Sequence, residues 1–308
     1  MTGRGGRAIV LVGVLAAVGV LGGLVQNGRI RVRIDSAEVR SVQDALVDWR
    51  FPVSGFLSGS LRENVISGQR GDTVLFGGDS HMEQYWPRVD SLIRFTRKPM
   101  PTAIFATVRA CPMFPGVGRK DVPACDLAYF AIMQRAKSAG IKTVVITSYW
   151  NDFFHRNLIF RAGDRARSTL RLEEPGMDSV FSRFEADISH LVKSGKTVFV
   201  VLTIPIGAHD EFDPRTWLPG RLEPTRRVAV IRQIGRADYA TRSSAVLSRV
   251  RLAAIRAGAL VLDPIPSMCG ALVCPTIDSA GNALYMDSRH LRSSVARKRA
   301  TWIDATLR

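Results

Sequence analysis

Five apolar runs rich in β-branched residues, separated by longer helical patterns, constrain the fold of this chain most strongly. The runs are TVLFGG (73–78), TAIFATV (102–108), TVVITSY (143–149), TVFVVLTI (197–204) and ALVLDP (259–264). Nearly continuous hydrophobicity predicts strands that are buried on both faces, which is typical of a parallel sheet. The sequence therefore predicts a three-layer α/β domain with a mostly parallel five-stranded sheet and right-handed crossovers.

Three of the segments between these runs have apolar residues at helical spacing and end at a glycine. They are residues 126–140, 177–195 and 236–258. A glycine in this place is typical of a helix C-terminus, because it adopts the left-handed conformation at no steric cost. The polar region of about residues 207–235, rich in proline and arginine, is interpreted as an insertion over the sheet edge or over the site.

The N-terminal region predicts a membrane anchor. Residues 8–25 form an uncharged apolar run of about 18 residues, which is near the minimum for a helix that crosses a bilayer. A cleaved signal peptide is the alternative, but no Ala-x-Ala site closes the run. We expect a signal anchor over residues 1–28, a stalk or partly structured linker over 29–70, and the main domain over 71–308. Arginines lie on both sides of the run, so charge does not decide its orientation.

The formal net charge of +16 comes mainly from arginine. Nucleic acid, an anionic membrane or cell-wall polymer, and a merely basic surface are the three interpretations of such a charge. No zinc-finger spacing or basic helical repeat appears, and the basic residues are scattered along the chain. A nucleic-acid-binding protein is expected to have a clustered basic footprint. The sequence therefore predicts no nucleic-acid partner.

The four cysteines form two pairs that are local in sequence, Cys111 with Cys125 and Cys269 with Cys274. Two disulfides would place the domain in an oxidising, extracytoplasmic compartment. Zinc binding is one alternative, but the spacings fit no common zinc pattern and no histidine neighbours either pair. Buried free thiols are the other alternative.

Gly-Gly-Asp-Ser-His follows the first predicted strand, where a turn would explain the two glycines. In an open parallel sheet, ligands bind beyond the carboxyl ends of the strands, and Ser80 lies just past such an end. Backbone N–H groups at the start of the following helix favour negative charge, which suits a nucleophile whose attack forms an oxyanion. A serine needs a base to act in this way. A turn residue or a helix cap is the structural alternative for Ser80.

His290 is the strongest candidate for that base. It follows Asp287 by three residues, just before the last predicted helix, and a carboxylate that close can orient an imidazole. His81 adjoins Ser80, but neighbours in sequence often point apart. His155 and His209 lie in polar loops and could contact substrate. His190 lies in an amphipathic helix, where a structural role is expected.

Together, these patterns resemble the SGNH (also called GDSL-like) hydrolase superfamily. More narrowly, the chain resembles the extracytoplasmic SGNH domains that are fused to acyltransferase-three membrane proteins. The resemblance covers about residues 70 to 308. It rests on the segments FGGDSHMEQYWP, ACPMFPG, VITSYWNDF, LDPIPSMCGALVCP and LYMDSRHL.

The resemblance implies a flavodoxin-like fold and a Ser–His–Asp mechanism. Ser80 would attack an ester carbonyl, His290 would take its proton, and Asp287 would orient His290. Oxyanion holes of the superfamily combine the serine N–H with a glycine and an asparagine. Here Ala110 stands in the glycine block and Asn151 in the asparagine block, and a loop cap is the structural alternative for Asn151.

We therefore expect carbohydrate O-acyl transfer, in particular O-acetyl transfer, or ester hydrolysis at the cell envelope. The expected partner is an acylated or acyl-accepting glycan, and no metal or organic cofactor is implied. With one apolar span, a transferase would need a separate membrane acyl donor protein. The expected location is the inner or cytoplasmic membrane, single-pass, with the catalytic domain on the periplasmic or cell-wall side. The alternative is a non-catalytic glycan-binding module with the same fold.

Overall fold

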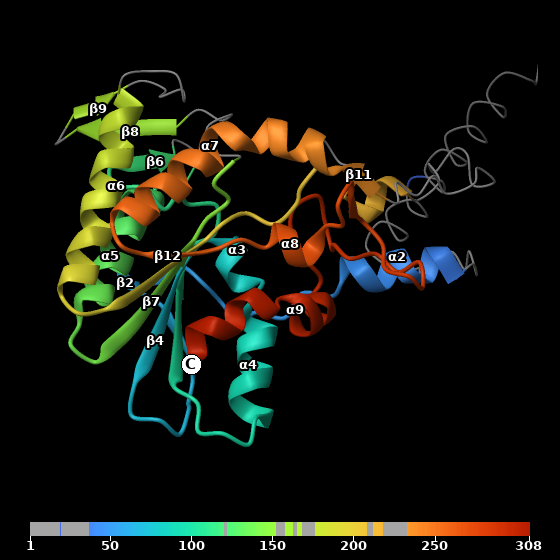
Figure 1. Cartoon of the computed structure of the whole chain (residues 1–308), viewed down its shortest axis with the longest axis horizontal. Helices are drawn as coiled ribbons and strands as arrows, with labels where there is room; N and C mark the ends of the chain where they lie inside the picture. Colours follow the sequence, from blue (N-terminus) through green and yellow to red (C-terminus); the bar gives the residue numbers. More distant parts are fainter. Residues whose placement is uncertain are drawn as a thin grey trace, which may run out of the picture. The chain divides into compact units, whose positions relative to one another are not determined.

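The computed structural model describes residue 19 and residues 37–119, 122–151, 158–162, 165–167, 176–207, 212–217 and 233–308. The chain divides into two compact units, Met1–Arg40 and Ser41–Arg308, and the second holds the central sheet (Figure 1). The predicted anchor, residues 8–25, lies outside the described residues except for Gly19. Among the residues that are described, no helix combines the length and apolar character needed to span a membrane.

A six-stranded sheet forms the centre of the second unit. Within the described residues its strand order is β12–β10–β7–β4–β5–β3. The strands are β3 (Glu63–Ile66), β4 (Thr73–Gly78), β5 (Thr102–Thr107), β7 (Ile141–Thr147), β10 (Thr197–Val201) and β12 (Leu260–Leu262). The five predicted strands are all present and parallel.

The prediction of five strands was wrong in number, because β3 pairs antiparallel with β5 at the edge of the sheet. The four residues of β3 alternate between exposed and more buried side chains and so form no apolar run. Together with the short hairpin of β1 (Phe56–Leu57) and β2 (Ser60–Leu61), β3 builds residues of the expected linker into the compact unit.

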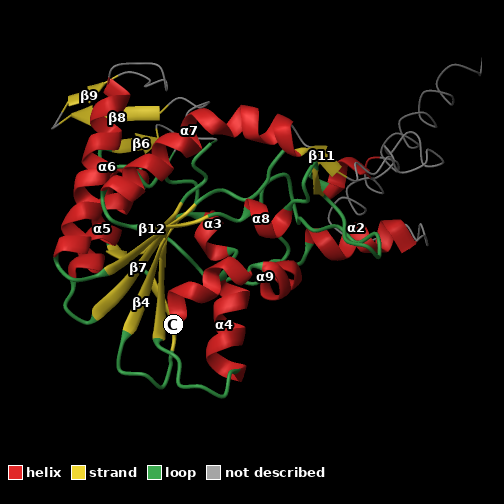
Figure 2. Cartoon of the chain, in the orientation of Figure 1, coloured by secondary structure: helices red, strands yellow, loops and turns green. Residues whose placement is uncertain are grey.

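Helices cover both faces of the sheet, as the three-layer prediction requires (Figure 2). The helices are α2 (Ala37–Leu46), α3 (Ser80–Glu83), α4 (Trp86–Phe95), α5 (Cys125–Lys137), α6 (Gly176–Lys193), α7 (Arg236–Arg256), α8 (Ile265–Met268) and α9 (Ser293–Arg299), with the 3-10 helices η2 (Pro214–Trp217) and η3 (Thr301–Leu307). The chain runs from β4 through α4 to β5 in one direction, and then returns through α5, α6 and α7 in the other. Right-handed crossovers therefore place α4 on one face and α5, α6 and α7 on the opposite face.

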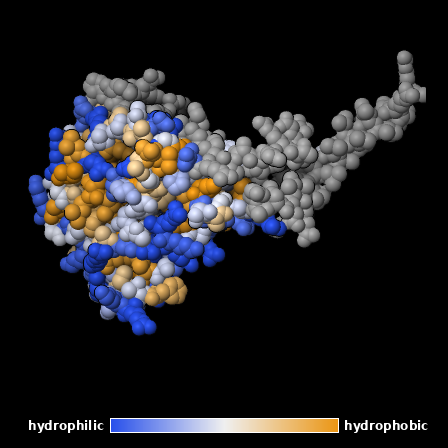
Figure 3. Space-filling model, turned by 45° about the vertical axis from the view of Figure 1, so that its right-hand side comes forward, coloured by the Kyte–Doolittle hydropathy of each residue, from blue (hydrophilic) through white to orange (hydrophobic). Residues whose placement is uncertain are grey.

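Short antiparallel strands outside the central sheet complete the second unit. They are β6 (Val117–Arg119), β8 (Leu158–Ala162) and β9 (Arg165–Arg167) in one sheet, and β11 (Gln233–Gly235) and β13 (Val273–Pro275) in another. Polar and apolar residues are interspersed over the face of the molecule that Figure 3 shows.

Two of the three glycines predicted at helix ends have the expected conformation. Gly195 after α6 has a φ of 84° and Gly258 after α7 has a φ of 82°, in the left-handed region that glycine adopts most readily. The third helix, α5, instead ends at Lys137 with an extended Ser138, before Gly140 is reached.

Gly77 and Gly78 are the last residues of β4 rather than a turn. A Cβ at Gly77 would lie 2.4 Å from Ile132 Cγ2 of α5. A Cβ at Gly78 would lie 2.3 Å from the Thr147 carbonyl oxygen of β7 and 2.9 Å from Met82 Cβ of α3. Successive residues of a strand face opposite sides of the sheet. The two glycines thus let α5 and α3 approach the end of β4 from its two faces.

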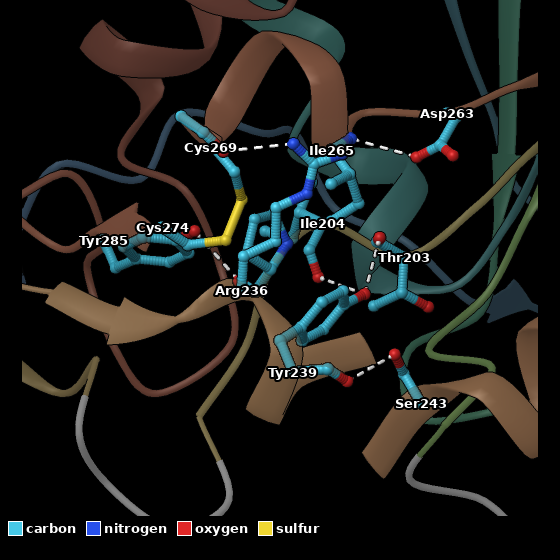
Figure 4. Close-up of a disulfide and its surroundings, with 12 residues drawn as sticks. Thr203, Ile204, Arg236, Tyr239, Ser243, Asp263, Ile265, Cys269, Cys274 and Tyr285 are labelled. Atoms are coloured by element: carbon cyan, nitrogen blue, oxygen red, sulfur yellow. Dashed lines mark hydrogen bonds between the residues drawn. A yellow bond between two sulfur atoms is a disulfide. The ribbon is translucent and has the colours of Figure 1, made fainter. Parts of the chain in front are cut away.

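Both predicted disulfides are present. Cys111–Cys125 joins the loop after β5 to the start of α5, and Cys269–Cys274 closes the short loop between α8 and β13 (Figure 4). All four cysteines are thereby oxidised. The alternatives of zinc ligands and free thiols are therefore wrong for these residues.

We expect loss of the Cys111–Cys125 disulfide to destabilise the protein more than loss of Cys269–Cys274. The first bond closes a loop of sequence separation 14 and the second one of separation 5. Loop-closure entropy gives about 3 kcal/mol for the first and roughly 2 kcal/mol for the second. Urea unfolding of paired Cys→Ala variants measures both values. Unreduced peptide mapping of exported protein should find both linked pairs, and four free thiols there would contradict the pairing.

Candidate active site

The strand order reverses beside β4, since the chain goes next to β5 on one side and then to β7 on the other. Such a switch point leaves a crevice beyond the carboxyl ends of the strands, where ligands of open α/β sheets bind. A cleft of about 480 Å³ lies there. It is lined by Trp49, Asp79, Ser80, Arg109, Ala110, Arg119, Tyr149, Arg215, Met286, Asp287, Ser288, Arg289 and His290.

Ser80 is the first residue of α3, and Asp79 is the N-cap of that helix. Asp79 Oδ1 accepts a hydrogen bond of 2.8 Å from the His81 N–H, and Oδ2 accepts one of 2.9 Å from the Tyr149 N–H. Burial raises the pKa of Asp79 to about 6, although these backbone N–H groups oppose the shift. The carboxylate of Asp79, rather than the hydroxyl of Ser80, is thus the acceptor that caps the helix. The Ser80 hydroxyl is therefore available to the cleft.

The Ser80 hydroxyl meets the imidazole of His290. Ser80 Oγ lies 2.8 Å from His290 Nε2, and His290 Nδ1 lies 2.8 Å from Asp287 Oδ2 and 3.0 Å from Asp287 Oδ1. The structure thus joins Ser80, His290 and Asp287 in one hydrogen-bonded chain, across a sequence separation of 210 residues between serine and histidine.

A tight loop holds Asp287 and His290 in this arrangement. The Met286 N–H donates to the His290 carbonyl at 2.9 Å, and Tyr285 and Leu291 form an isolated β-bridge. The Leu291 N–H also donates to Gln84 Oε1 at 3.1 Å. This last bond connects the loop that carries Asp287 and His290 to Gln84, the residue that follows α3. It therefore fixes the loop relative to the helix that begins with Ser80.

Asp287 is held as a carboxylate. Burial disfavours its charged form, but the hydrogen bond and charge of His290, together with the backbone N–H groups of Arg289 and His290, outweigh that effect and lower its pKa to about 2. An ionised carboxylate on Nδ1 favours the imidazole tautomer whose Nε2 can accept a proton from Ser80.

The ring of His81 lies beside that of His290, with centroids 5.0 Å apart, but it has no hydrogen bond to Ser80 or Asp287 and does not line the cleft. Its ring is buried and stacks on Tyr149, with centroids 4.5 Å apart and planes 9° apart. Neither ring nitrogen has a hydrogen-bond partner among the residues the structure describes. Burial and the nearby His290 hold the pKa of His81 well below its usual value. Of the other histidines, His190 is exposed on α6, and His155 and His209 lie outside the described residues.

Trp49 belongs to the site although it lies in the segment expected to be a linker. Its ring meets His290 edge to face, with centroids 5.2 Å apart. Two hydrogen bonds connect this segment to the start of α9. The Arg50 N–H donates to the Ser293 side-chain Oγ at 2.7 Å, and the Ser293 N–H donates to the Asp48 carbonyl at 2.8 Å. The sequence carried no signal for this role beyond the tryptophan itself, and no spacing that links it to His290.

Ala110 lines the cleft in a conformation that glycine would adopt with less strain. Its φ is 59°, in the left-handed region, and an alanine there keeps the backbone N–H that a glycine would offer. Asn151 is buried but is not among the cleft residues. Its side chain lies against the Tyr239 hydroxyl. The oxyanion role of Asn151 stays a prediction that this placement does not support.

Replacing Ala110 with glycine is expected to stabilise the protein slightly. The left-handed conformation costs an L-residue about 1–2 kcal/mol, and the greater freedom of glycine in the unfolded chain offsets roughly 0.4–1 kcal/mol of that gain. Chemical unfolding of Ala110→Gly should therefore show a stability that is higher by about 0 to 1.6 kcal/mol. Ala245→Gly in the middle of α7 is the matched control and should lower stability. A lower stability for Ala110→Gly would contradict the strain at this position.

Comparison with known proteins is consistent with this geometry. The family model described as the SGNH domain fused to AT3 domains matches residues 53–301. Among solved structures, the periplasmic domain of the Salmonella ser. Paratyphi A lipopolysaccharide acetyltransferase has a TM-score of 0.54 at 10% identity, covering 89% of this chain and 97% of that one. The structure of TesA has a TM-score of 0.40 at 10% identity, covering 76% and 97%.

A search of curated proteins finds no match. The identities to the solved structures are low, so the likeness to the acetyltransferase domain concerns the fold alone. The family match itself covers most of the chain and includes the segments that carry Ser80, Asp287 and His290. The chain therefore belongs to the family of SGNH domains that are found fused to AT3 domains.

Proposed function

We propose that this protein is a serine-dependent carbohydrate O-acyltransferase or esterase of the cell envelope. The observation that carries the proposal is the hydrogen-bonded chain Ser80–His290–Asp287, placed at the switch point of the sheet. This is the arrangement of a nucleophile, a base and the group that orients the base.

In the first half of the proposed reaction, Ser80 Oγ attacks the carbonyl carbon of an ester. His290 Nε2 accepts the serine proton as the new C–O bond forms, and Asp287 stabilises the resulting imidazolium. The tetrahedral intermediate then expels the alcohol, which takes the proton from His290. The acyl group remains on Ser80.

In the second half, His290 removes a proton from the acceptor. Water as the acceptor gives hydrolysis, and a sugar hydroxyl gives O-acyl transfer. The attack releases the acyl group and returns the proton to Ser80. The two outcomes differ only in which acceptor reaches the acyl-enzyme.

Backbone N–H groups are the oxyanion donors we propose. One is the N–H of Ser80, the first residue of α3, because the N–H groups of His81, Met82 and Glu83 are already bonded to Asp79. The other is the N–H of Ala110, which lines the same cleft in the left-handed conformation. Such donors typically contribute about a hundred- to a thousand-fold in rate each.

The proposed location is the extracytoplasmic side of a membrane, with residues 8–25 as the anchor. Two disulfides support an oxidising compartment, and the matching family occurs fused to AT3 domains. A separate membrane protein that supplies the acyl group is part of the transferase form of this proposal.

The test is to incubate the purified chain with a p-nitrophenyl ester panel and with an acetylated glycan. Release of p-nitrophenol and of acetate would establish ester chemistry. Adding an unacylated glycan and measuring its acylation by mass spectrometry separates transfer from hydrolysis. A folded chain that releases neither product would contradict the proposal and favour the glycan-binding alternative.

A further inference from the structure

The cleft around Ser80 is rich in guanidinium groups. Among the described residues that line it, four are arginines, Arg109, Arg119, Arg215 and Arg289, and none is a lysine. They come from the loop after β5, from β6, from η2 and from the loop that carries His290. Arginine presents a planar fork of donors that fits a carboxylate or phosphate in bidentate fashion.

Two of the carboxylates near these arginines are withdrawn from the cleft, and the two that line it, Asp79 and Asp287, are bonded to backbone N–H groups and to His290. Glu83 pairs with Arg109, and its side chain is 0% exposed while that of Arg109 is 52% exposed. Asp213 pairs with Arg215 in the same way, with exposures of 4% and 64%. A ligand in the cleft therefore meets the guanidinium groups of Arg109 and Arg215 before the carboxylates that pair with them. Because Coulomb energy falls with distance, the nearer cations dominate even though these charges formally balance.

Arg109 is held in place by the groups behind it. Its Nε donates to Glu83 Oε2 at 2.7 Å, and Glu83 Oε1 accepts a second bond of 3.1 Å from Thr107 Oγ1. No described residue accepts a hydrogen bond from the two terminal nitrogens of Arg109. Its Cζ lies 5.9 Å from the centre of the Trp49 ring, and the same ring contacts His290. A fixed guanidinium with available donors thus lies close to the reacting groups.

Two aromatic side chains line the cleft, Trp49 and Tyr149, and Arg289 places a second guanidinium beside Tyr149. Arg289 follows Asp287 in the loop that carries His290, and its Cζ lies 5.4 Å from the centre of the Tyr149 ring. Tyr149 is in turn fixed by its stacking on His81 and by its N–H bond to Asp79. Arg109 therefore lies by Trp49 and Arg289 by Tyr149. Arg289 directly precedes His290, and the Trp49 ring beside Arg109 contacts His290.

We propose that this cleft selects substrates that carry a carboxylate or phosphate group, which Arg109 and Arg289 bind beside Ser80. The inference rests on the proposed function for the role of Ser80, and it names the substrate class as anionic glycans or their esters. Binding of the anion itself requires no turnover, so it can be measured independently of the reaction.

The experiment uses the purified full chain with Ser80→Ala, which binds without reacting, in two matched ligand pairs. Methyl β-D-glucuronide and methyl β-D-glucoside differ by a carboxylate, and glucose 6-phosphate and glucose differ by a phosphate. Calorimetry or ligand-observed NMR should show that at least one anion binds about 10- to 100-fold more tightly than its neutral partner, as for charge-assisted hydrogen bonds. Which pair shows the preference distinguishes carboxylate from phosphate recognition.

Variants in the same background identify the residues. Arg109→Gln alone would leave the buried Glu83 unpaired, which can unfold the chain, so Arg109→Gln is combined with Glu83→Gln. The double variant and Arg289→Gln should each reduce the preference by about 10-fold. Glu83→Gln alone should reduce the preference less than the double variant, because Arg109 keeps its charge and loses only the carboxylate that positions it. Arg94→Gln, whose side chain on α4 is 59% exposed, should retain the preference.

Equal affinity for charged and neutral ligands, or no binding of either anion, would overturn the inference. So would a preference that survives replacement of both arginines. The ester assay is read separately. A chain that is inactive on esters but still prefers the glucuronide would contradict the esterase proposal and support the anion site. A chain that is active on esters but shows no preference for the anions would contradict the anion site and support the esterase proposal.

Discussion

Ser80→Ala should abolish ester turnover while leaving the fold intact. Ser80 Oγ is the hydroxyl that His290 Nε2 contacts at 2.8 Å, and a covalent mechanism has no substitute for it. Loss of a nucleophile of this kind costs on the order of 10⁴–10⁶ in rate. The measurement is the steady-state rate of p-nitrophenyl acetate hydrolysis by wild type and variant, each shown to be folded by its thermal unfolding curve.

The matched control is Ser244→Ala, an exposed serine on α7 whose hydroxyl bonds the Thr241 carbonyl at 3.2 Å. It should keep the wild-type rate. Brief reaction of the wild type with an acylating ester, followed by peptide mass spectrometry, should place the acyl group on the peptide that contains Ser80. Near-wild-type turnover in folded Ser80→Ala would end the enzyme proposal.

His290→Ala should be the next most damaging change, and His81→Ala a much weaker one. A general base typically contributes about a hundred- to ten-thousand-fold, so His290→Ala should cost at least that factor. Asp287→Ala should cost less, because a misoriented imidazole keeps some basicity. His81 lies outside the cleft lining, with its ring against Tyr149, so its replacement should act through packing.

The three variants are compared on one activated ester, with circular dichroism as the check on folding. His81→Phe is a useful companion to His81→Ala, because it keeps a ring on Tyr149 and removes two buried nitrogens that lack partners among the described residues. It should be at least as stable as His81→Ala and should retain more activity. An inactive His81→Ala beside an active His290→Ala would mean that the base has been assigned to the wrong histidine.

Much of the fold could be predicted because its strands carry a strong local signal. Parallel strands that are buried on both faces must be apolar along most of their length, and β4, β5, β7 and β10 have this property after their first residues. The edge strand β3 has only one buried face, and its alternating pattern over four residues does not stand out from a loop. Local patterns therefore missed β3, whereas the opposite edge strand, β12, was predicted from its apolar run.

The candidate site was predictable in part for a similar reason. Ser80 lies at the end of an apolar strand, and Asp287 lies three residues before His290, so both features are visible in short stretches of sequence. The parallel sheet then implies that the carboxyl ends of its strands meet at one edge. These two steps suffice to bring Ser80 and His290 under consideration together, without any knowledge of the loops.

The amino-acid sequence by itself determined the central strands, the likeness to the SGNH superfamily and the choice of Ser80, Asp287 and His290. Only the tertiary structure decided that Asp79 caps the serine helix, that Trp49 contacts His290, and that Arg109 and Arg289 lie in the same cleft. The physical reason is that these contacts join segments far apart in the chain. Their geometry depends on how loops pack at the sheet edge, and no periodicity within a single segment records it.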